Sequence, residues 1–297
     1  MEIPQQILKK VELLLNTSIH TIETPKSGFD HIVFTFHTDK NVKLLAKAKY
    51  KAVIDALAIN TIREQKLSVP TPEVIAYSEA EQISIFEFIE GEMLDRLPEH
   101  EIVLMFPKVM QMVAEIHKVK GSASGNFSDV YYKKPTKSWK EFLKGKYSTD
   151  DEYYKWEKLI NNPQFDGSIV REVLKYIHTQ IDQMQEPTEF SLLHSDLHGG
   201  NMIVSNGKIR GLIDWSDAKY GDPLYDFSRL KLFLVGGNKE MLQIYGTFLK
   251  MSPQEQQREK LYYAMHLLRF FYFTVEEKLN EWAEKNYLRL QHLHKTL

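Results

Sequence analysis

Cysteine is absent from the 297 residues, which excludes a disulfide framework, a thiolate nucleophile and a zinc site built from thiolates. Long apolar runs are also missing, so no segment of the sequence reaches membrane-spanning length. The N-terminal segment lacks the uncharged core of a signal peptide because Lys9, Lys10 and Glu12 interrupt it. We therefore expect a cytoplasmic protein with no membrane partner.

A surplus of either charge is missing as well. The chain has 38 Lys and Arg residues against 40 Asp and Glu residues, for a net charge of -2. Binding to nucleic acid would need a broad positive field, so we expect no nucleic-acid partner. The length and the 43% content of hydrophobic residues suit a globular chain with one large domain or two lobes. We expect this chain to be a monomer or a weak dimer.

Residues 1–90 have the patterns of a small, mostly β lobe. Apolar residues recur at helical spacing after Pro4 and predict an amphipathic helix near the start of the chain. A second helix is expected at about residues 51–65. Alternating runs predict strands at residues 30–37, 42–48, 73–77 and 83–88, the first two of which form an antiparallel hairpin.

Beyond this lobe the sequence becomes mainly helical. An apolar stripe runs from Ile102 to Ile116, and helical patterns return after Pro223. One short hairpin interrupts the helical part. These patterns predict an α+β fold with a small β-rich lobe at residues 1–90 and a larger, mainly helical lobe at residues 91–297.

The hairpin in the larger lobe is expected to turn at Asn206-Gly207, because both residues accept the positive φ angles of a type I′ turn. In the resulting register, we expect Asn201 to lie opposite Leu212. Asp214 then lies diagonally across from Asn201, with roughly 7–8 Å between their Cβ atoms. A divalent ion, which takes oxygen ligands at about 2.0–2.1 Å, could sit between these two side chains.

A third polar residue, Asp196, precedes Asn201 by five residues on a glycine-containing loop and can face the same point. A metal held by one amide oxygen and one carboxylate, beside a carboxylate that binds no metal, suits phosphoryl transfer from a nucleotide. The ion neutralises phosphate charge, while the free carboxylate orients the attacking hydroxyl and accepts its proton. The competing interpretation is a hairpin whose polar flanks only cap and turn the chain.

The sequence motifs of this stretch resemble those of a known family. His-x-Asp-x-x-x-x-Asn at residues 194–201 and Ile-Asp-Trp at residues 213–215 resemble the catalytic and metal-binding motifs of the protein-kinase-like fold. With Gly-Asp-Pro-Leu-Tyr-Asp at residues 221–226, the sequence resembles the aminoglycoside phosphotransferase and choline kinase superfamily, and its layout is similar to hygromycin phosphotransferases. The resemblance implies a nucleotide-binding lobe at residues 1–90 and a catalytic and substrate-binding lobe at residues 91–297.

By that resemblance, Asp196 is the catalytic base, and Asn201 and Asp214 are the ligands of Mg²⁺. His194 is expected to hold the loop structurally. His198 is a second catalytic candidate because it could approach the transferred phosphate, although a structural role is an equal alternative.

The resemblance also implies a lysine on the third strand of the small lobe that reaches the nucleotide phosphates and pairs with an acid on the next helix. Lys47 is the best match for this lysine, and Asp55 for the acid, with Glu64 as the alternative. Alternation sets Lys43 and Lys49 on the same face as Lys47, so a solvated lysine edge of the sheet is the competing interpretation.

Two further parts of a nucleotide site are implied by the resemblance. Residues 24–30 match the loop that covers phosphates, although they contain one glycine where protein kinases have three. Residues 85–91 resemble the hinge between lobes, so the main chain of Glu87 and Ile89 is expected to hydrogen-bond the base. The implied cofactors are Mg²⁺ and ATP or GTP as phosphate donor.

The acceptor is expected to be a hydroxyl of a small molecule that receives the γ-phosphate. A cationic acceptor such as an aminoglycoside-type antibiotic or choline would want carboxylates near the cleft, and two groups qualify, residues 150–152 and Glu277, Glu281 and Glu284. A solvated helix face explains the second group equally well. The alternatives are a metabolic kinase for choline, an amino alcohol or a sugar, and a catalytically silent nucleotide-binding protein.

Overall fold

The computed structural model describes residues 3–24, 32–49, 51–134, 136–148 and 154–297. The chain forms two compact units. The first consists of Met1–Val119 and His194–Ala218, and the second of Lys120–Leu193 and Lys219–Leu297. These units follow spatial contacts, whereas the predicted lobes follow sequence order, so the lobe division stays a prediction. No helix in the described ranges is long and apolar enough to cross a lipid bilayer.

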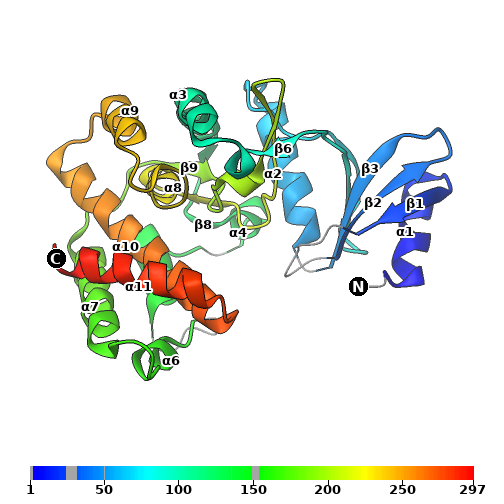
Figure 1. Cartoon of the computed structure of the whole chain (residues 1–297). Helices are drawn as coiled ribbons and strands as arrows, with labels where there is room; N and C mark the ends of the chain where they lie inside the picture. Colours follow the sequence, from blue (N-terminus) through cyan, green and yellow to red (C-terminus); the bar gives the residue numbers. More distant parts are fainter. Residues whose placement is uncertain (1–2, 25–31, 50, 135, 149–153) are drawn as a thin grey trace. The chain divides into compact units, whose positions relative to one another are not determined.

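An antiparallel five-stranded sheet, in the order β1-β2-β3-β5-β4, lies in the first unit (Figure 1). Its strands are β1 (Ile19–Glu23), β2 (Ile32–Thr38), β3 (Lys43–Ala48), β4 (Val74–Ser78) and β5 (Ile83–Glu87). All four predicted strands are confirmed, and β2 and β3 form the predicted hairpin. Strand β1 was not predicted because it is an edge strand with four of its five residues exposed, so no apolar alternation marks it.

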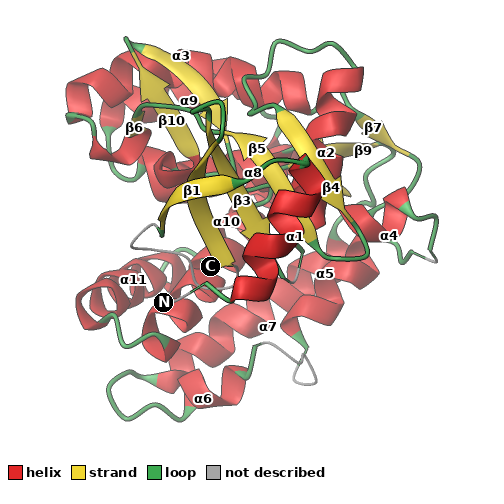
Figure 2. Cartoon of the chain, turned by 90° about the vertical axis from the view of Figure 1, so that its right-hand side faces the viewer, coloured by secondary structure: helices red, strands yellow, loops and turns green. Residues whose placement is uncertain are grey.

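Helix α1 (Gln5–Leu15) covers one face of this sheet, as Figure 2 shows. Its Val11 packs in a fully buried cluster with Phe34 of β2 and Ala46 of β3. Successive side chains of a strand point to opposite faces, so Lys47 points away from α1. The sheet therefore has one apolar face covered by α1 and one face that carries Lys47.

The rest of the first unit combines helices, 3₁₀ turns and a second, smaller sheet. Its elements are helices α2 (Ala52–Glu64) and α3 (Glu99–Ile116), 3₁₀ turns η1 (Leu94–Arg96) and η2 (Gly199–Asn201), and strands β6 (Glu92–Met93), β10 (Met202–Ser205) and β11 (Lys208–Leu212). Strand β10 lies between β11 and β6 in a three-stranded sheet. Turn η1 contacts both η2 and β10, so the chain after β5 reaches the loop that precedes β10.

The β10–β11 hairpin turns where the sequence predicted, but its register differs from the expectation. A bulge in β11 leaves Arg210 unpaired, so that Met202 pairs with Leu212. Asn201 lies across from Ile213, whose N–H donates to the Asn201 carbonyl oxygen at 3.0 Å. The expectation that Asn201 lies opposite Leu212 was therefore wrong by one residue, because the sequence has no signal for the bulge.

The second unit is mainly helical, with one small sheet in the order β7-β9-β12-β8. Its elements are β7 (Lys120–Gly121), β8 (Gly125–Asn126), α4 (Phe127–Tyr131), α5 (Trp139–Tyr147), α6 (Trp156–Ile160), α7 (Gly167–Gln183), β9 (Phe190–Leu193), β12 (Lys219–Gly221), α8 (Leu224–Leu230), the π-helical η3 (Lys231–Val235), α9 (Lys239–Leu249), α10 (Pro253–Glu276) and α11 (Asn280–His294). A buried polar chain ties three of these segments together. Trp139 Nε1 donates to the Tyr262 hydroxyl, which donates to Asp222 Oδ2, each at 3.0 Å.

Replacing Phe36 with Ala should destabilise the first unit, because Phe36 is 0% exposed in the cluster beneath α1. Truncating a buried Phe costs about 3–5 kcal/mol of unfolding free energy, since it removes apolar burial and leaves a cavity. Leu13→Ala on α1 is the control, because Leu13 is 80% exposed and its loss should cost less than about 0.5 kcal/mol. Urea unfolding measures both values, and equal losses would contradict the packing described here.

Candidate active site

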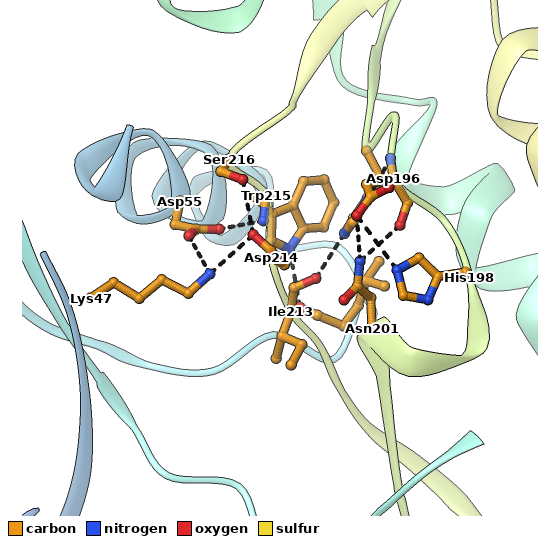
Figure 3. A network of polar contacts seen from close by, with 11 residues as sticks. Lys47, Asp55, Asp196, His198, Asn201, Ile213, Asp214, Trp215 and Ser216 are labelled. Atoms are coloured by element: carbon orange, nitrogen blue, oxygen red, sulfur yellow. Dashed lines mark hydrogen bonds and ion pairs between the residues drawn. The ribbon is translucent and has the colours of Figure 1, made fainter. Parts of the chain in front are cut away.

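Two loops meet at the open end of the β10–β11 hairpin. One contains residues 194–201 and precedes β10, and the other contains residues 213–218 and follows β11. The hydrogen bond between Ile213 and Asn201 joins them. Both loops belong to the same compact unit as β3 and α2, and Figure 3 shows side chains from all four segments converging.

His194 braces the two loops from within. Its ring is fully buried, and Nδ1 accepts the Asp196 N–H at 3.2 Å. Nε2 therefore carries the proton and donates it to the Ile213 carbonyl oxygen at 2.9 Å. The ring also packs on Trp215, with 4.5 Å between ring centroids. These contacts fit the expected structural role of His194.

Asp196 is oriented by its own loop. Asn201 Nδ2 donates to the Asp196 carbonyl oxygen at 2.9 Å and to Asp196 Oδ2 at 3.0 Å. His198 Nε2 lies 3.5 Å from the same carboxylate oxygen. Because His198 Nδ1 accepts the Gly200 N–H at 3.1 Å, the proton of the neutral ring sits on Nε2 and faces Asp196. The carboxylate thus has two N–H groups directed at Oδ2.

Asp214, the second residue of the loop after β11, adopts the left-handed conformation, with φ of 64°. Its Oδ1 accepts from Lys47 Nζ at 3.1 Å and from the Ser216 hydroxyl at 2.9 Å. The next residue, Trp215, donates its main-chain N–H to Asp55 Oδ1 and its ring N–H to the Leu212 carbonyl oxygen. A non-glycine residue in this conformation persists only where its surroundings fix it, and these bonds do so.

Lys47 and Asp55 form a buried ion pair, with 2.7 Å between Nζ and Oδ2. Burial alone would lower the pKa of Lys47, but the charges of Asp55 and Asp214 outweigh it and raise that pKa above its usual range. Burial raises the pKa of Asp55, and the charge of Lys47 offsets this increase only in part. Burial also opposes ionisation of Asp214, yet the Lys47 charge outweighs it and lowers the pKa of Asp214.

The donor set of the two loops fits a small hard cation. Asn201 uses its Nδ2 for hydrogen bonds to Asp196, and Asp214 uses Oδ1 for Lys47 and Ser216. Asn201 Oδ1 and Asp214 Oδ2 accept no hydrogen bond from the described part of the chain. Mg²⁺ takes one or two protein oxygens and completes its shell with phosphate and water. No cluster of three or more His, Asp or Glu residues suited to a metal occurs in the described ranges.

The structure brings together most residues predicted for the site. One polar network contains six of them: Lys47, Asp55, Asp196, His198, Asn201 and Asp214 (Figure 3). Glu64, the alternative partner of Lys47, ends α2 as an exposed residue. The solvated lysine edge was wrong for Lys47, because β3 is an inner strand and the Lys47 side chain is only 11% exposed.

The other residues predicted to bind the nucleotide are Glu87, Ile89 and the loop at residues 24–30. Glu87 ends β5, and its N–H donates to the Glu73 carbonyl oxygen. Ile89 lies between β5 and β6, and its side chain packs so closely on Gly211 that a Cβ there would lie 2.5 Å from Ile89 Cδ1. Of the loop predicted to cover phosphates, residues 25–30 lie outside the described residues.

The carboxylates predicted for the acceptor fall into two groups. Residues 150–152 lie outside the described residues. Glu277, Glu281 and Glu284 are exposed and belong to the second unit. Asp217, from the loop after β11, forms an ion pair with Lys51 at 2.8 Å. That pair was not predicted, and its only sequence signal is a second lysine soon after Lys47.

The chain is similar in sequence to known phosphotransferases. The model of the phosphotransferase enzyme family matches residues 21–258. The chain is 27% identical over 173 residues to hygromycin-B 4-O-kinase from Escherichia coli, over 55% of this chain and 48% of that protein. It is 43% identical over 47 residues to the uncharacterized protein YcbJ from Bacillus subtilis (strain 168), over 16% of this chain and 15% of that protein. The chain thus matches about half or less of the length of these relatives.

Solved structures share the fold across nearly the whole chain. The apo form of a thermostable mutant of aminoglycoside phosphotransferase APH(4)-Ia has a TM-score of 0.74 at 20% identity, over 97% of this chain and 98% of that chain. A ternary complex of such a mutant with ADP and hygromycin B has a TM-score of 0.72 at 19% identity, over 98% of both chains. The predicted protein-kinase-like α+β fold and the resemblance to aminoglycoside phosphotransferases are confirmed.

Replacing Lys47 with Met should destabilise the protein because Asp55 would stay buried without its cation. Removing one partner of a buried ion pair costs about 3–5 kcal/mol of unfolding free energy. A carboxylate whose pKa is raised in the folded state imposes its penalty above the unfolded pKa and loses it as acid protonates the group. Urea unfolding should therefore give a larger difference between variant and parent at about pH 7 than at about pH 4.

Asp214 adds to this pH-dependent difference, because Lys47 stabilises its ionised form in the parent and is lost in the variant. The lowered pKa of Asp214 contributes stability above its unfolded pKa, and this contribution is lost as the pH falls through the folded pKa. Lys40→Met is the control, because Lys40 is exposed in the turn between β2 and β3. A pH-independent loss in Lys47→Met, or the same loss in both variants, would argue against the buried pair.

Proposed function

We infer the function of this chain from its family: it belongs to the phosphotransferase enzyme family. We propose that it transfers the γ-phosphate of ATP or GTP to a hydroxyl of a small molecule. The observation that carries this proposal is the Asp196 carboxylate, oriented by Asn201 and His198 in the loop that is hydrogen-bonded to the loop of Asp214.

In the proposed reaction, Asp196 accepts the proton of the acceptor hydroxyl. The acceptor oxygen forms a bond to the γ-phosphorus, while the bond from that phosphorus to the bridging oxygen of the nucleoside diphosphate breaks. Asn201 Nδ2 and the His198 Nε2–H, both directed at Oδ2, fix the direction of the Asp196 carboxylate. Holding the base in one direction lowers the entropic part of the barrier.

The nucleotide would be held by residues of the two loops and of strands β3 and β5. Asn201 Oδ1 and Asp214 would hold Mg²⁺, which neutralises charge on the phosphates. Lys47, kept in place by Asp55, would bind a phosphate oxygen through its ammonium group. The main chain of Glu87 and Ile89 would hydrogen-bond the base. Solved relatives in complex with ADP and AMP-PNP support a nucleotide donor.

The acceptor is proposed to be an aminoglycoside-type molecule. The hygromycin-B 4-O-kinase of Escherichia coli, and structural relatives solved with hygromycin B or with kanamycin, support this choice. A metabolic kinase for an amino alcohol or a sugar would use the same base and metal ligands. A product assay with radiolabelled nucleotide and each acceptor class separates these possibilities.

Asp196→Asn should abolish transfer while leaving nucleotide binding nearly intact. The amide keeps the shape of the side chain but accepts no proton, so kcat should fall by roughly 10²- to 10⁴-fold. Affinity for a non-hydrolysable nucleotide should stay within about twofold of the parent. Asp39→Asn, in an exposed turn, is the matched control and should retain parental kcat. Undiminished transfer by Asp196→Asn would refute Asp196 as the base.

Asp214→Ala should remove the effect of magnesium on nucleotide binding. In the parent, chelation of Mg²⁺ should weaken binding of a non-hydrolysable nucleotide by roughly tenfold, measured by calorimetry. The variant should bind with the weak affinity whether or not Mg²⁺ is present. Asp39→Ala should respond to chelation like the parent. If chelation changed neither the parent nor the variant, Asp214 would not be a metal ligand.

A further inference from the structure

A surface cavity of about 440 Å³ lies in the second unit, where residues of η3, of α9 and of the start of α10 line it. We call it the α9 cavity. It shares no residue with the polar network of the candidate active site, whose members all belong to the first unit. Cavities that bind small molecules span about 300–1,000 Å³ and combine apolar walls with a few polar groups. The α9 cavity falls within that range, and its lining has both components.

A buried carboxylate fixes the polar side of the α9 cavity. Glu259 is 3% exposed, and its two oxygens accept from Lys231 Nζ at 2.9 Å and from the Tyr245 hydroxyl at 3.2 Å. The Lys231 ammonium group also lies 5.8 Å and 5.7 Å from the ring centroids of Tyr245 and Tyr263, close enough for cation–π attraction. Lys231 is the first residue of η3, and π-helical turns are rare and frequently lie at functional sites. These contacts hold Lys231 in place while part of its side chain stays exposed.

A second lysine leaves the α9 cavity with one positive charge in excess. Lys250 follows α9 in the left-handed conformation, with φ of 46°, and also lines the cavity. In the part of the chain that the structure describes, no carboxylate forms an ion pair with Lys250. Glu259 balances only one of the two lysines. A ligand that carries a single negative charge is therefore electrostatically complementary to this lining.

Gly246 gives a second, independent indication that the cavity receives a ligand. It lies inside α9, where glycine is less favourable than alanine because it loses more backbone freedom on folding. Its φ is not in the left-handed region, so the backbone does not require glycine. Apart from its own helical turn, no atom of the described residues lies within 4 Å of a Cβ built at Gly246. The packing of the chain does not explain this glycine, but space for another molecule does.

The wall of the cavity beside Gly246 is apolar. Leu242 lies one helical turn before Gly246 and is 38% exposed, and Met251 follows the end of α9. A large apolar side chain that stays exposed at a cavity gains burial when a ligand covers it. The α9 cavity therefore offers an apolar surface next to two ammonium groups.

We propose that the α9 cavity binds a small molecule that joins an apolar body to one carboxylate. The carboxylate accepts charge-assisted hydrogen bonds from Lys231 and Lys250, and the apolar body packs on Leu242 and Met251 in the space beside Gly246. A phosphate monoester is a poorer match, because it carries about 1.5–2 negative charges against an excess of one positive charge. This site is a second binding site of the chain and does not depend on the proposed phosphoryl transfer.

Calorimetry with octanoate as the probe, in the absence of nucleotide, tests the proposal. Octanoate should bind the parent in a one-to-one ratio with a Kd of roughly 0.1–1 mM, a reasonable affinity for so small a ligand. Two comparison compounds separate its parts, since 1-octanol keeps the chain without the charge and acetate keeps the charge without the chain. Both should bind at least about tenfold more weakly than octanoate, and octyl phosphate should also bind more weakly.

Two variants locate the binding site. Lys250→Gln should raise the Kd for octanoate by roughly tenfold, the usual effect of losing one charged hydrogen bond. Its control is Lys239→Gln, because Lys239 is exposed at the start of α9 and does not line the cavity. Gly246→Leu should abolish binding by filling the open space, yet its Tm should equal or exceed that of the parent, since leucine favours helix more than glycine does. Thr247→Leu adds an apolar side chain at the next, exposed position and should keep the parental Kd.

Three results would overturn the inference. The first is the absence of saturable octanoate binding to the parent, and the second is 1-octanol binding as tightly as octanoate. The third is a Kd for octanoate that Lys250→Gln leaves unchanged, which decides the matter even where Gly246→Leu fails to fold. Phosphoryl transfer is measured in none of these experiments, so their failure would leave the proposed function standing, and loss of transfer activity would not touch this site.

Discussion

The buried carboxylate of Asp55 is the constraint on which the arrangement of the first unit depends. One of its oxygens accepts from Lys47 on the sheet, and the other accepts from the main chain of Trp215, directly after Asp214. A carboxylate that is 1% exposed is stable only when such partners compensate for its lost hydration. Strand β3, helix α2 and the loop after β11 are therefore coupled, because none can shift without leaving a buried charge unpaired.

Two residues of the loops at the site have strained backbone conformations that hydrogen bonds from neighbouring side chains hold in place. Ser195 and Asp214 both adopt positive φ angles, of 66° and 64°, which cost about 1–3 kcal/mol each for residues other than glycine. His194 links the two strained segments by bonding to the main chain of both Asp196 and Ile213. The strain in one loop is thus held by contacts with the other, which keeps Asp196 and Asn201 at fixed positions.

The sequence predicted those site residues that lie close to one another along the chain. Asp196, Asn201 and Asp214 lie within 20 residues on one hairpin, so turn chemistry and spacing sufficed to group them. The bulge at Arg210 could not be predicted, because it is a backbone irregularity with no residue type of its own. The contact between turns η1 and η2 could not be predicted, because it joins segments about a hundred residues apart in the sequence.

The partner of Lys47 on α2 is an aspartate, Asp55, because the connection between β3 and α2 is short. Lys49 and Lys51 both have positive φ, of 80° and 62°, and such angles reverse the chain within a few residues of β3. Helix α2 consequently begins at Ala52, and its first turn already stands beside Lys47, where an aspartate reaches 2.7 Å. A glutamate at position 55 would have to fold an extra methylene into space that is already closed to solvent. An acid two turns later, such as Glu64 at the far end of α2, lies too far along the helix axis to replace it.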